Sequence, residues 1–79
     1  MNFVEFGKTI ATLRKERNIS QQQIANDLHI SRATISSFES GSHVDIGFKK
    51  VIQIADYLGY DIALKEKSSF PVFEDIVNG

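Results

Sequence analysis

Residues 20–41 read SQQQIANDLHISRATISSFESG, and this stretch decides the fold because it contains two helix starts. Ser20 can accept a hydrogen bond from the backbone three residues on, and Gln23 can return one, as in a capping box. A second N-cap, Ser31, follows eleven residues later. The connection at residues 28–30 is about three residues long, which is typical of a helix-turn-helix. The sequence therefore predicts two short helices joined by a tight corner.

The apolar residues of this stretch would place both helices on one core. Hydrophobic pairs flank each helix start, Ile19 with Ile24 and Ile30 with Ile35, where they would act as staples. Ala25 is small where the two helices should cross, since a larger side chain would push them apart. The predicted shared core consists of Ile24, Leu28, Ile30, Ile35 and Phe38.

The outward face of the second helix carries short and polar side chains. They are Arg32, Ala33, Thr34, Ser36 and Ser37. Short side chains let a helix lie deep in the major groove of DNA, where the base edges are exposed. Arg32 would be the main hydrogen-bonding reader because arginine matches the guanine edge, and Ala33 or the Thr34 methyl group would contact a thymine methyl. The pattern predicts base readout by this face.

The same residues resemble the Xre/Cro family of helix-turn-helix repressors, and the resemblance covers about residues 5–66. It is carried by Arg14, Ser20-Gln21, Ala25, Ile35 and Glu39-Ser40-Gly41. The run RATISSFESG, with the tail after the last helix, most resembles the HipB-type antitoxins of bacterial toxin–antitoxin pairs. One departure is His29, since the family usually has glycine at this corner, where the backbone favours positive φ.

The resemblance implies roles for three residues around the motif. Arg14 would form a partly buried ion pair with Glu39, which ties the first helix to the end of the recognition helix. Gln21 would donate its amide to a DNA phosphate, where the helix N-terminus adds partial positive charge.

The loop after Gly41 would run beside the DNA backbone in this family. Ser42 and His43 are therefore phosphate candidates, together with Ser31 at the start of the recognition helix. His43 is equally well explained as an exposed loop histidine. No second histidine or carboxylate lies at a metal-ligand spacing from it, so we expect no metal site.

Helical periodicity predicts one helix before the motif and one after it. The first has roughly four turns and carries Phe3, Phe6, Ile10 and Leu13 at helical spacing. The last has an apolar stripe at Phe48, Val51, Ile52, Ala55 and Leu58, which Ile54 and Tyr57 broaden. An apolar face this wide on a small domain suggests that a partner covers part of it.

After the last helix the apolar period changes to that of a strand, because Tyr60, Ile62 and Leu64 alternate with polar or small residues. A lone strand leaves its backbone groups unpaired. We therefore expect residues 60–65 to pair with the same strand of a second copy about a two-fold axis. Tyr57 would lie in the same dimer interface.

The predicted fold class is mainly α: a lambda-repressor-like helix-turn-helix bundle of four to five helices, with one short C-terminal β-strand that pairs across a homodimer. Residues 1–66 would form the DNA-binding domain. Residues 67–79 would form a tail, for which a frayed terminus, a cover for the domain and a docking segment remain open.

Composition fits one small globular domain: the chain has 79 residues, of which 42% are hydrophobic and 24% charged. No apolar run is long enough to span a membrane, no signal peptide is recognisable and cysteine is absent, so we expect a cytoplasmic protein. The net charge of −1 divides unevenly, since residues 1–59 hold seven Lys and Arg against six Asp and Glu, and residues 60–79 two against four. This modest positive excess predicts few phosphate contacts from lysine and arginine.

Together these features predict a sequence-specific DNA-binding transcriptional repressor that acts as a homodimer on a palindromic operator. The resemblance implies a HipB-like antitoxin that represses its own operon and neutralises a HipA-like kinase toxin. The alternatives are a stand-alone, phage-type Xre regulator and a protein-interaction module without DNA binding. An enzyme is not expected, because the sequence has no cysteine nucleophile, evident carboxylate pair or phosphate-binding glycine loop, and no cofactor is predicted.

Overall fold

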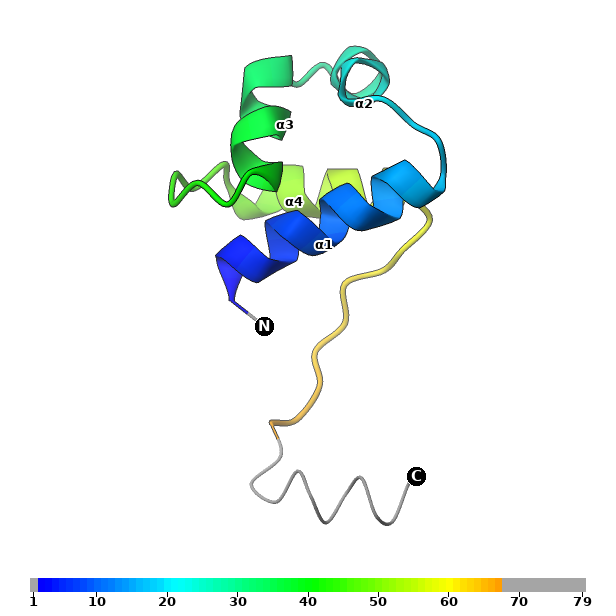
Figure 1. Cartoon of the computed structure of the whole chain (residues 1–79). Helices are drawn as coiled ribbons and strands as arrows, with labels where there is room; N and C mark the ends of the chain where they lie inside the picture. Colours follow the sequence, from blue (N-terminus) through cyan, green and yellow to red (C-terminus); the bar gives the residue numbers. More distant parts are fainter. Residues whose placement is uncertain (1, 68–79) are drawn as a thin grey trace.

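The structure, a computed structural model, describes residues 2–67 and contains four α-helices in that range. They are α1 (Phe3–Glu16), α2 (Gln21–Leu28), α3 (Arg32–Glu39) and α4 (Phe48–Tyr57) (Figure 1). α3 packs against both α1 and α2, and α2 also packs against α4. The prediction of a mainly helical bundle with a helix-turn-helix is confirmed, with α2 and α3 as the motif.

Side chains cap the starts of α1 and α2. Asn2 and Glu5 form a full capping box, in which Asn2 Oδ1 accepts from the Glu5 N–H at 2.8 Å. Ser20 Oγ accepts from the Gln23 N–H at 3.0 Å, as predicted. The predicted second bond of this capping box, from the Gln23 side chain back to the Ser20 backbone, is wrong. Gln23 Nε2 instead donates to the Tyr57 hydroxyl at 3.2 Å. α4 offers Gln23 a partner, so its amide links two helices.

The corner between α2 and α3 has the left-handed backbone that the motif requires. His29 adopts φ 57° and ψ 41°, and the Ile30 N–H donates to the Ala25 carbonyl at 3.1 Å, which closes α2. A histidine in this conformation carries strain that glycine would avoid. Gly41 ends α3 with φ 86°, as predicted.

The hydrophobic core lies where the helices meet. Its buried residues include Ile24, Ile30, Ile35, Phe38 and Ile54, and Leu28 packs against them half-buried. The Phe38 ring is central, because its centroid lies 5.4 Å from that of Phe3 and 6.2 Å from that of Phe6. Phe3 and Phe6 of α1 therefore pack against the inner side of α3.

α1 and α3 approach each other closely at Gly7, in the first half of α1. A Cβ atom at this position would overlap the carbonyl oxygen of Phe38, which is a backbone atom and cannot rotate away. Glycine is therefore required here, although it weakens a helix. Gly7 had no predicted role, but an isolated glycine within a helical pattern is a signal of such a close contact.

Much of the apolar face of α4 is buried inside the single chain, where the sequence suggested that a partner covers part of it. Ile54 and Leu58 are 0% and 1% exposed. Tyr57 is half-buried, and its hydroxyl donates to an Asp27 carboxylate oxygen; this bond raises the pKa of Tyr57, because ionisation would break it. α2 therefore contacts α4 at Tyr57, a residue that was expected in the dimer interface. The apolar side chains of α4 that remain exposed are Phe48 and Ile52.

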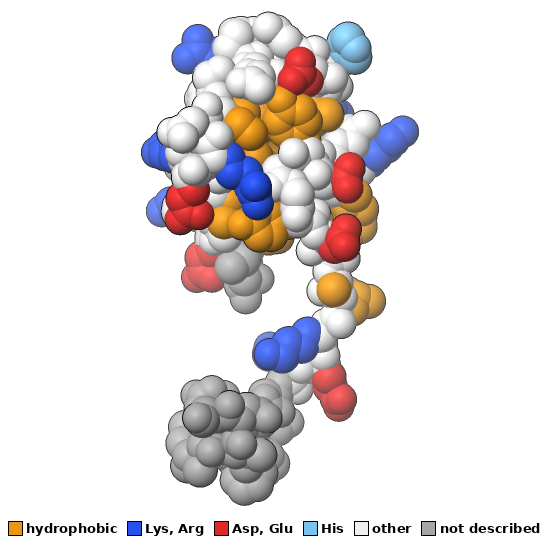
Figure 2. All heavy atoms as spheres, turned by 90° about the vertical axis from the view of Figure 1, so that its right-hand side faces the viewer, with side chains coloured by type: hydrophobic (Ala, Val, Ile, Leu, Met, Phe, Trp, Pro, Cys, Tyr) orange, Lys and Arg blue, Asp and Glu red, His pale blue; other side chains and the backbone are white. Residues whose placement is uncertain are grey.

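Residues 60–65 do not form the predicted strand in the single chain. The Tyr60 N–H donates to the Ala55 carbonyl at 2.9 Å, and the Arg17 guanidinium lies 5.1 Å from the Tyr60 ring centre. Asp61, Ile62 and Ala63 still line a hollow beside α1, and after them the chain leads away from the body of the domain (Figure 2). A strand needs a ladder partner, and residues 2–67 contain none. The predicted tail beyond Lys67 lies outside the described residues.

Candidate nucleic-acid interface

The outward face of α3 is built by a side-chain cap and a buried inner stripe. Ser31 Oγ accepts from the Thr34 N–H at 3.1 Å and so starts the helix. Ile35 and Phe38 are 0% and 1% exposed and fix the rotation of α3 about its axis. The five residues predicted to read bases consequently share the outer side: Arg32, Ala33 and Ser36 are exposed, and Thr34 and Ser37 are half-buried.

A hollow of about 370 Å³ lies between α3 and the loop that precedes α4. Its lining residues are Ala33, Thr34, Ser37, Val44, Asp45, Ile46 and Lys50. Three of these belong to the predicted reading face, so short side chains form one wall of the hollow. The Asp45 carboxylate is engaged by the Gly47 N–H at 2.8 Å, and Lys50 supplies a cation at the start of α4.

A buried ion pair fixes α3 against α1. Arg14 Nε and Nη2 donate to Glu39 Oε2 and Oε1 at 2.8 and 2.9 Å, and the two residues are 8% and 7% exposed. The third guanidinium nitrogen, Nη1, donates to the Ile19 carbonyl at 2.7 Å. Arg14 therefore joins the last turn of α1, the segment before α2 and the end of α3 through charge-assisted hydrogen bonds.

Gln21 extends this network to the first residue of α2. Its Nε2 donates to Glu39 Oε1 at 3.0 Å. A carboxylate only accepts hydrogen bonds, so the amide nitrogen must face Glu39 and the second N–H of the amide remains for another acceptor. The Gln21–Glu39 contact was not predicted, because the two residues are separated by 18 positions and no local pattern connects them.

The other predicted phosphate contacts lie in two places. Ser31 and Thr34 are brought together at the start of α3, with 2.7 Å between their hydroxyl oxygens. Ser42 and His43 lie in the loop after α3, where Ser42 is half-buried and His43 exposed. Ser42 Oγ accepts from the Val44 N–H at 3.1 Å, which leaves its hydroxyl proton free to donate.

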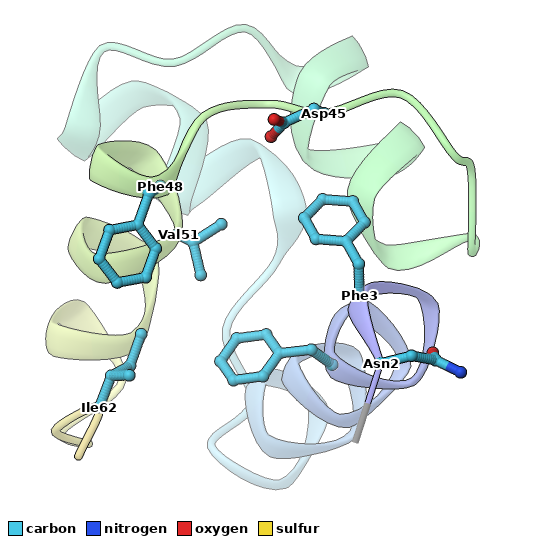
Figure 3. A pocket seen from close by; sticks show the side chains of 7 residues that line it. Asn2, Phe3, Asp45, Phe48, Val51 and Ile62 are labelled. Carbon is cyan, nitrogen blue, oxygen red and sulfur yellow. The ribbon is translucent and has the colours of Figure 1, made fainter. Parts of the chain in front are cut away.

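A second hollow of about 450 Å³ lies between the start of α1, α4 and the segment after it (Figure 3). The side chains of Phe3, Phe48, Val51 and Ile62 face it. Asp45 is the one ionisable residue among those that line it. This hollow is therefore a mainly apolar surface, in which no second ionisable side chain of the described residues accompanies Asp45.

The described part of the chain has neither a cluster of metal ligands nor a helix that could span a membrane. Between residues 2 and 67, no three His, Cys, Asp or Glu side chains lie close enough together to hold a metal ion. None of the helices in that range has the length and apolar character needed to cross a membrane.

Comparisons with known proteins agree with this geometry. A family model described as a helix-turn-helix domain matches residues 7–64. The chain is 32% identical over 72 residues to an uncharacterized HTH-type transcriptional regulator, YqaE, of Bacillus subtilis (strain 168), covering 89% of this chain and 61% of the relative. It is 42% identical over 38 residues to the HTH-type transcriptional activator BcrR of Enterococcus faecalis, covering 48% and 19% respectively. The chain thus spans less than two thirds of the length of these curated relatives, and no solved structure matches it.

Proposed function

Because the chain belongs to the helix-turn-helix domain family, we propose that it binds double-stranded DNA in a sequence-specific way and regulates transcription. The observation that carries the proposal is the row of short side chains on the outer side of α3, backed by the buried residues Ile35 and Phe38. In this arrangement α3 lies in the major groove, and its readers are Arg32, Ala33, Thr34, Ser36 and Ser37.

The experiment that tests this proposal is selection from a pool of randomised duplexes. The purified chain should enrich one sequence, and its affinity for that duplex should fall as the salt concentration rises, because phosphate contacts release counterions. Equal affinity for all duplexes would contradict sequence-specific binding, and retention of no duplex would favour the interaction-module alternative.

Gln21, Ser31, Ser42 and His43 position the chain on the DNA backbone in this proposal. Glu39 orients the Gln21 amide, and the remaining N–H of Gln21 donates to a phosphate. These contacts set the register of α3 and carry no base preference themselves.

Gln21→Ala is expected to weaken enriched and random duplexes to a similar degree, by about 1 kcal/mol, since one phosphate hydrogen bond is lost. Gln22→Ala is the matched control, because Gln22 Nε2 donates to Asn26 Oδ1 within α2 at 2.8 Å. Fluorescence anisotropy on both duplexes measures the two losses. A change confined to one base position would place Gln21 among the readers.

The proposed regulator acts as a homodimer on a palindromic operator. Residues 61–65 form no backbone–backbone hydrogen bond within the described range, and Tyr60, Ile62 and Leu64 are 40%, 37% and 103% exposed. Antiparallel pairing of this segment with that of a second copy would satisfy these groups. Two recognition helices about 34–36 Å apart would then match one turn of DNA.

Ile62→Lys is expected to dissociate the dimer, because it places a charge in the paired apolar face, and to weaken operator binding with it. Sedimentation at micromolar concentration measures the mass. Asp61→Lys, on the alternate face of the segment, is the control and should remain dimeric. A monomeric wild-type chain would contradict the dimer.

The finer proposal is a HipB-like antitoxin that represses its own operon and neutralises a HipA-like kinase. It rests on the resemblance of residues 32–41. A stand-alone regulator is the second candidate, and it is compatible with the two relatives, which are described as an HTH-type transcriptional regulator and an HTH-type transcriptional activator. Co-purification with a kinase from the neighbouring reading frame, and relief of that kinase's growth arrest, would support the antitoxin. A neighbourhood without such a frame would favour the stand-alone regulator.

A further inference from the structure

We infer that the Ser31 hydroxyl makes Thr34 a hydrogen-bond acceptor toward DNA, so that Thr34 selects a base with an amino group in the major groove. The inference rests on the proposed function and adds a rule of specificity to it. It concerns two side chains at the start of α3, the helix that would lie in the groove.

The geometry begins with a pair of hydroxyl groups in contact. Ser31 Oγ and Thr34 Oγ1 lie 2.7 Å apart, and Ser31 Oγ also accepts from the Thr34 N–H at 3.1 Å. Two hydroxyl groups have two protons, and one of them lies in the bond between the oxygens. The hydroxyl that accepts this bond keeps its own proton free for another acceptor. In the free protein either oxygen can be the donor.

A DNA phosphate would decide between the two arrangements. Phosphate oxygens only accept hydrogen bonds at neutral pH, so Ser31 must give its proton to reach one. Thr34 must then donate to Ser31 Oγ. Ser31 accepts from the Thr34 N–H and O–H and donates to the phosphate, which uses its full capacity. The Thr34 proton is then used in the bond to Ser31, so Thr34 Oγ1 has lone pairs to accept a hydrogen bond and no free proton to donate.

Thr34 therefore accepts from whatever base edge it meets. Adenine N6 and cytosine N4 are amino donors in the major groove, whereas guanine O6 and N7 and thymine O4 are acceptors. Thr34 should favour adenine or cytosine on the contacted strand. One net hydrogen bond of about 1 kcal/mol corresponds to a preference of about fivefold over guanine or thymine.

Four proteins test the rule by selection from the randomised duplex pool. Wild type should enrich adenine or cytosine at one position of each half-site. Thr34→Val keeps the shape, removes the hydroxyl and should lose this preference. Ser31→Ala frees the Thr34 hydroxyl to donate as well as accept, so guanine and thymine should become equally acceptable there. Ser31→Asn should keep the preference, because its side-chain oxygen accepts from Thr34 and its amide can donate to the phosphate.

Competition between duplexes that differ only at this position gives the ratio of dissociation constants. The expected ratio is about fivefold for wild type and Ser31→Asn, and near one for Thr34→Val and Ser31→Ala. Circular dichroism melts verify folding, and if Ser31→Ala is too unstable through loss of its cap, Ser31→Gly removes the same hydroxyl with a smaller loss of helix stability and should also give a ratio near one.

The outcomes separate this inference from the function beneath it. A wild-type protein that enriches no duplex contradicts the proposed function, and the inference fails with it. An enriched site with guanine or thymine at the position that Thr34→Val alters overturns the inference alone. The inference alone is also overturned if Thr34→Val changes the base preference at no position. The same holds if Ser31→Ala keeps the base preference of wild type.

Discussion

Gly7→Ala is expected to destabilise the domain by on the order of 3 kcal/mol, a large part of the free energy of unfolding of a chain this small. The added Cβ would overlap the Phe38 carbonyl oxygen, so α1 and α3 would have to separate. That separation opens the core around Phe38 and displaces α3 from its position. Thermal or urea unfolding followed by circular dichroism measures the loss.

Gly47→Ala is the matched control for Gly7→Ala. Gly47 has φ +92°, and nothing lies within 4 Å of a Cβ built there. This change should cost about 1–3 kcal/mol from backbone strain alone, with α1 and α3 left in contact. Because alanine otherwise favours a helix, a Gly7→Ala protein as stable as wild type would show that the contact with Phe38 does not limit the approach of α1 and α3.

Removal of either partner of the Arg14–Glu39 pair is expected to cost about 3–5 kcal/mol, because the remaining charge stays buried without its counter-ion. The pair is bidentate and nearly inaccessible to water. Arg14→Ala, Glu39→Ala and the double variant form a cycle, which should show strong coupling. Lys15→Ala is the control, since Lys15 is exposed on the same helix and its loss should be within about 0.5 kcal/mol.

Additive losses in that cycle would contradict the structural role of the pair. Glu39→Ala should also weaken DNA binding beyond its effect on folding, because Gln21 loses the acceptor that orients its amide. Arg14→Ala leaves that acceptor in place. The difference in DNA affinity between folded Glu39→Ala and folded Arg14→Ala protein therefore measures the effect of orienting Gln21. The loss that the two variants share measures the effect of fixing α3 against α1.

Local features of the fold could be predicted from the sequence. The caps at Ser20 and Ser31 and the left-handed corner at His29 depend on residues within one helical turn, and the sequence displays such patterns directly. The rotation of α3 also followed from its apolar spacing, which placed Ile35 and Phe38 inside. These short-range determinants give the helix-turn-helix and its outer face.

Features that depend on distant residues could be predicted only where the family resemblance implied them, as for the Arg14–Glu39 pair. The Gly7–Phe38 approach and the Gln21–Glu39 bond join segments whose spacing carries no periodic signal. The apolar width of α4 did not show which residues the single chain buries by itself, and Ile54 and Leu58 are among them. The alternation at residues 60–65 is typical of a strand, but a strand needs a second strand beside it, and residues 2–67 contain none.

The most direct test of the central claim, that α3 reads bases in the major groove, is the affinity of wild type and Arg32→Ala for the duplex that wild type enriches. Arg32 is exposed at the start of α3, and its guanidinium would pair with a guanine edge. We expect Arg32→Ala to lose about 1–3 kcal/mol on this duplex, to relax the preference at one base pair and to keep the wild-type melting temperature. A footprint and an affinity series that Arg32→Ala leaves unchanged would contradict the claim.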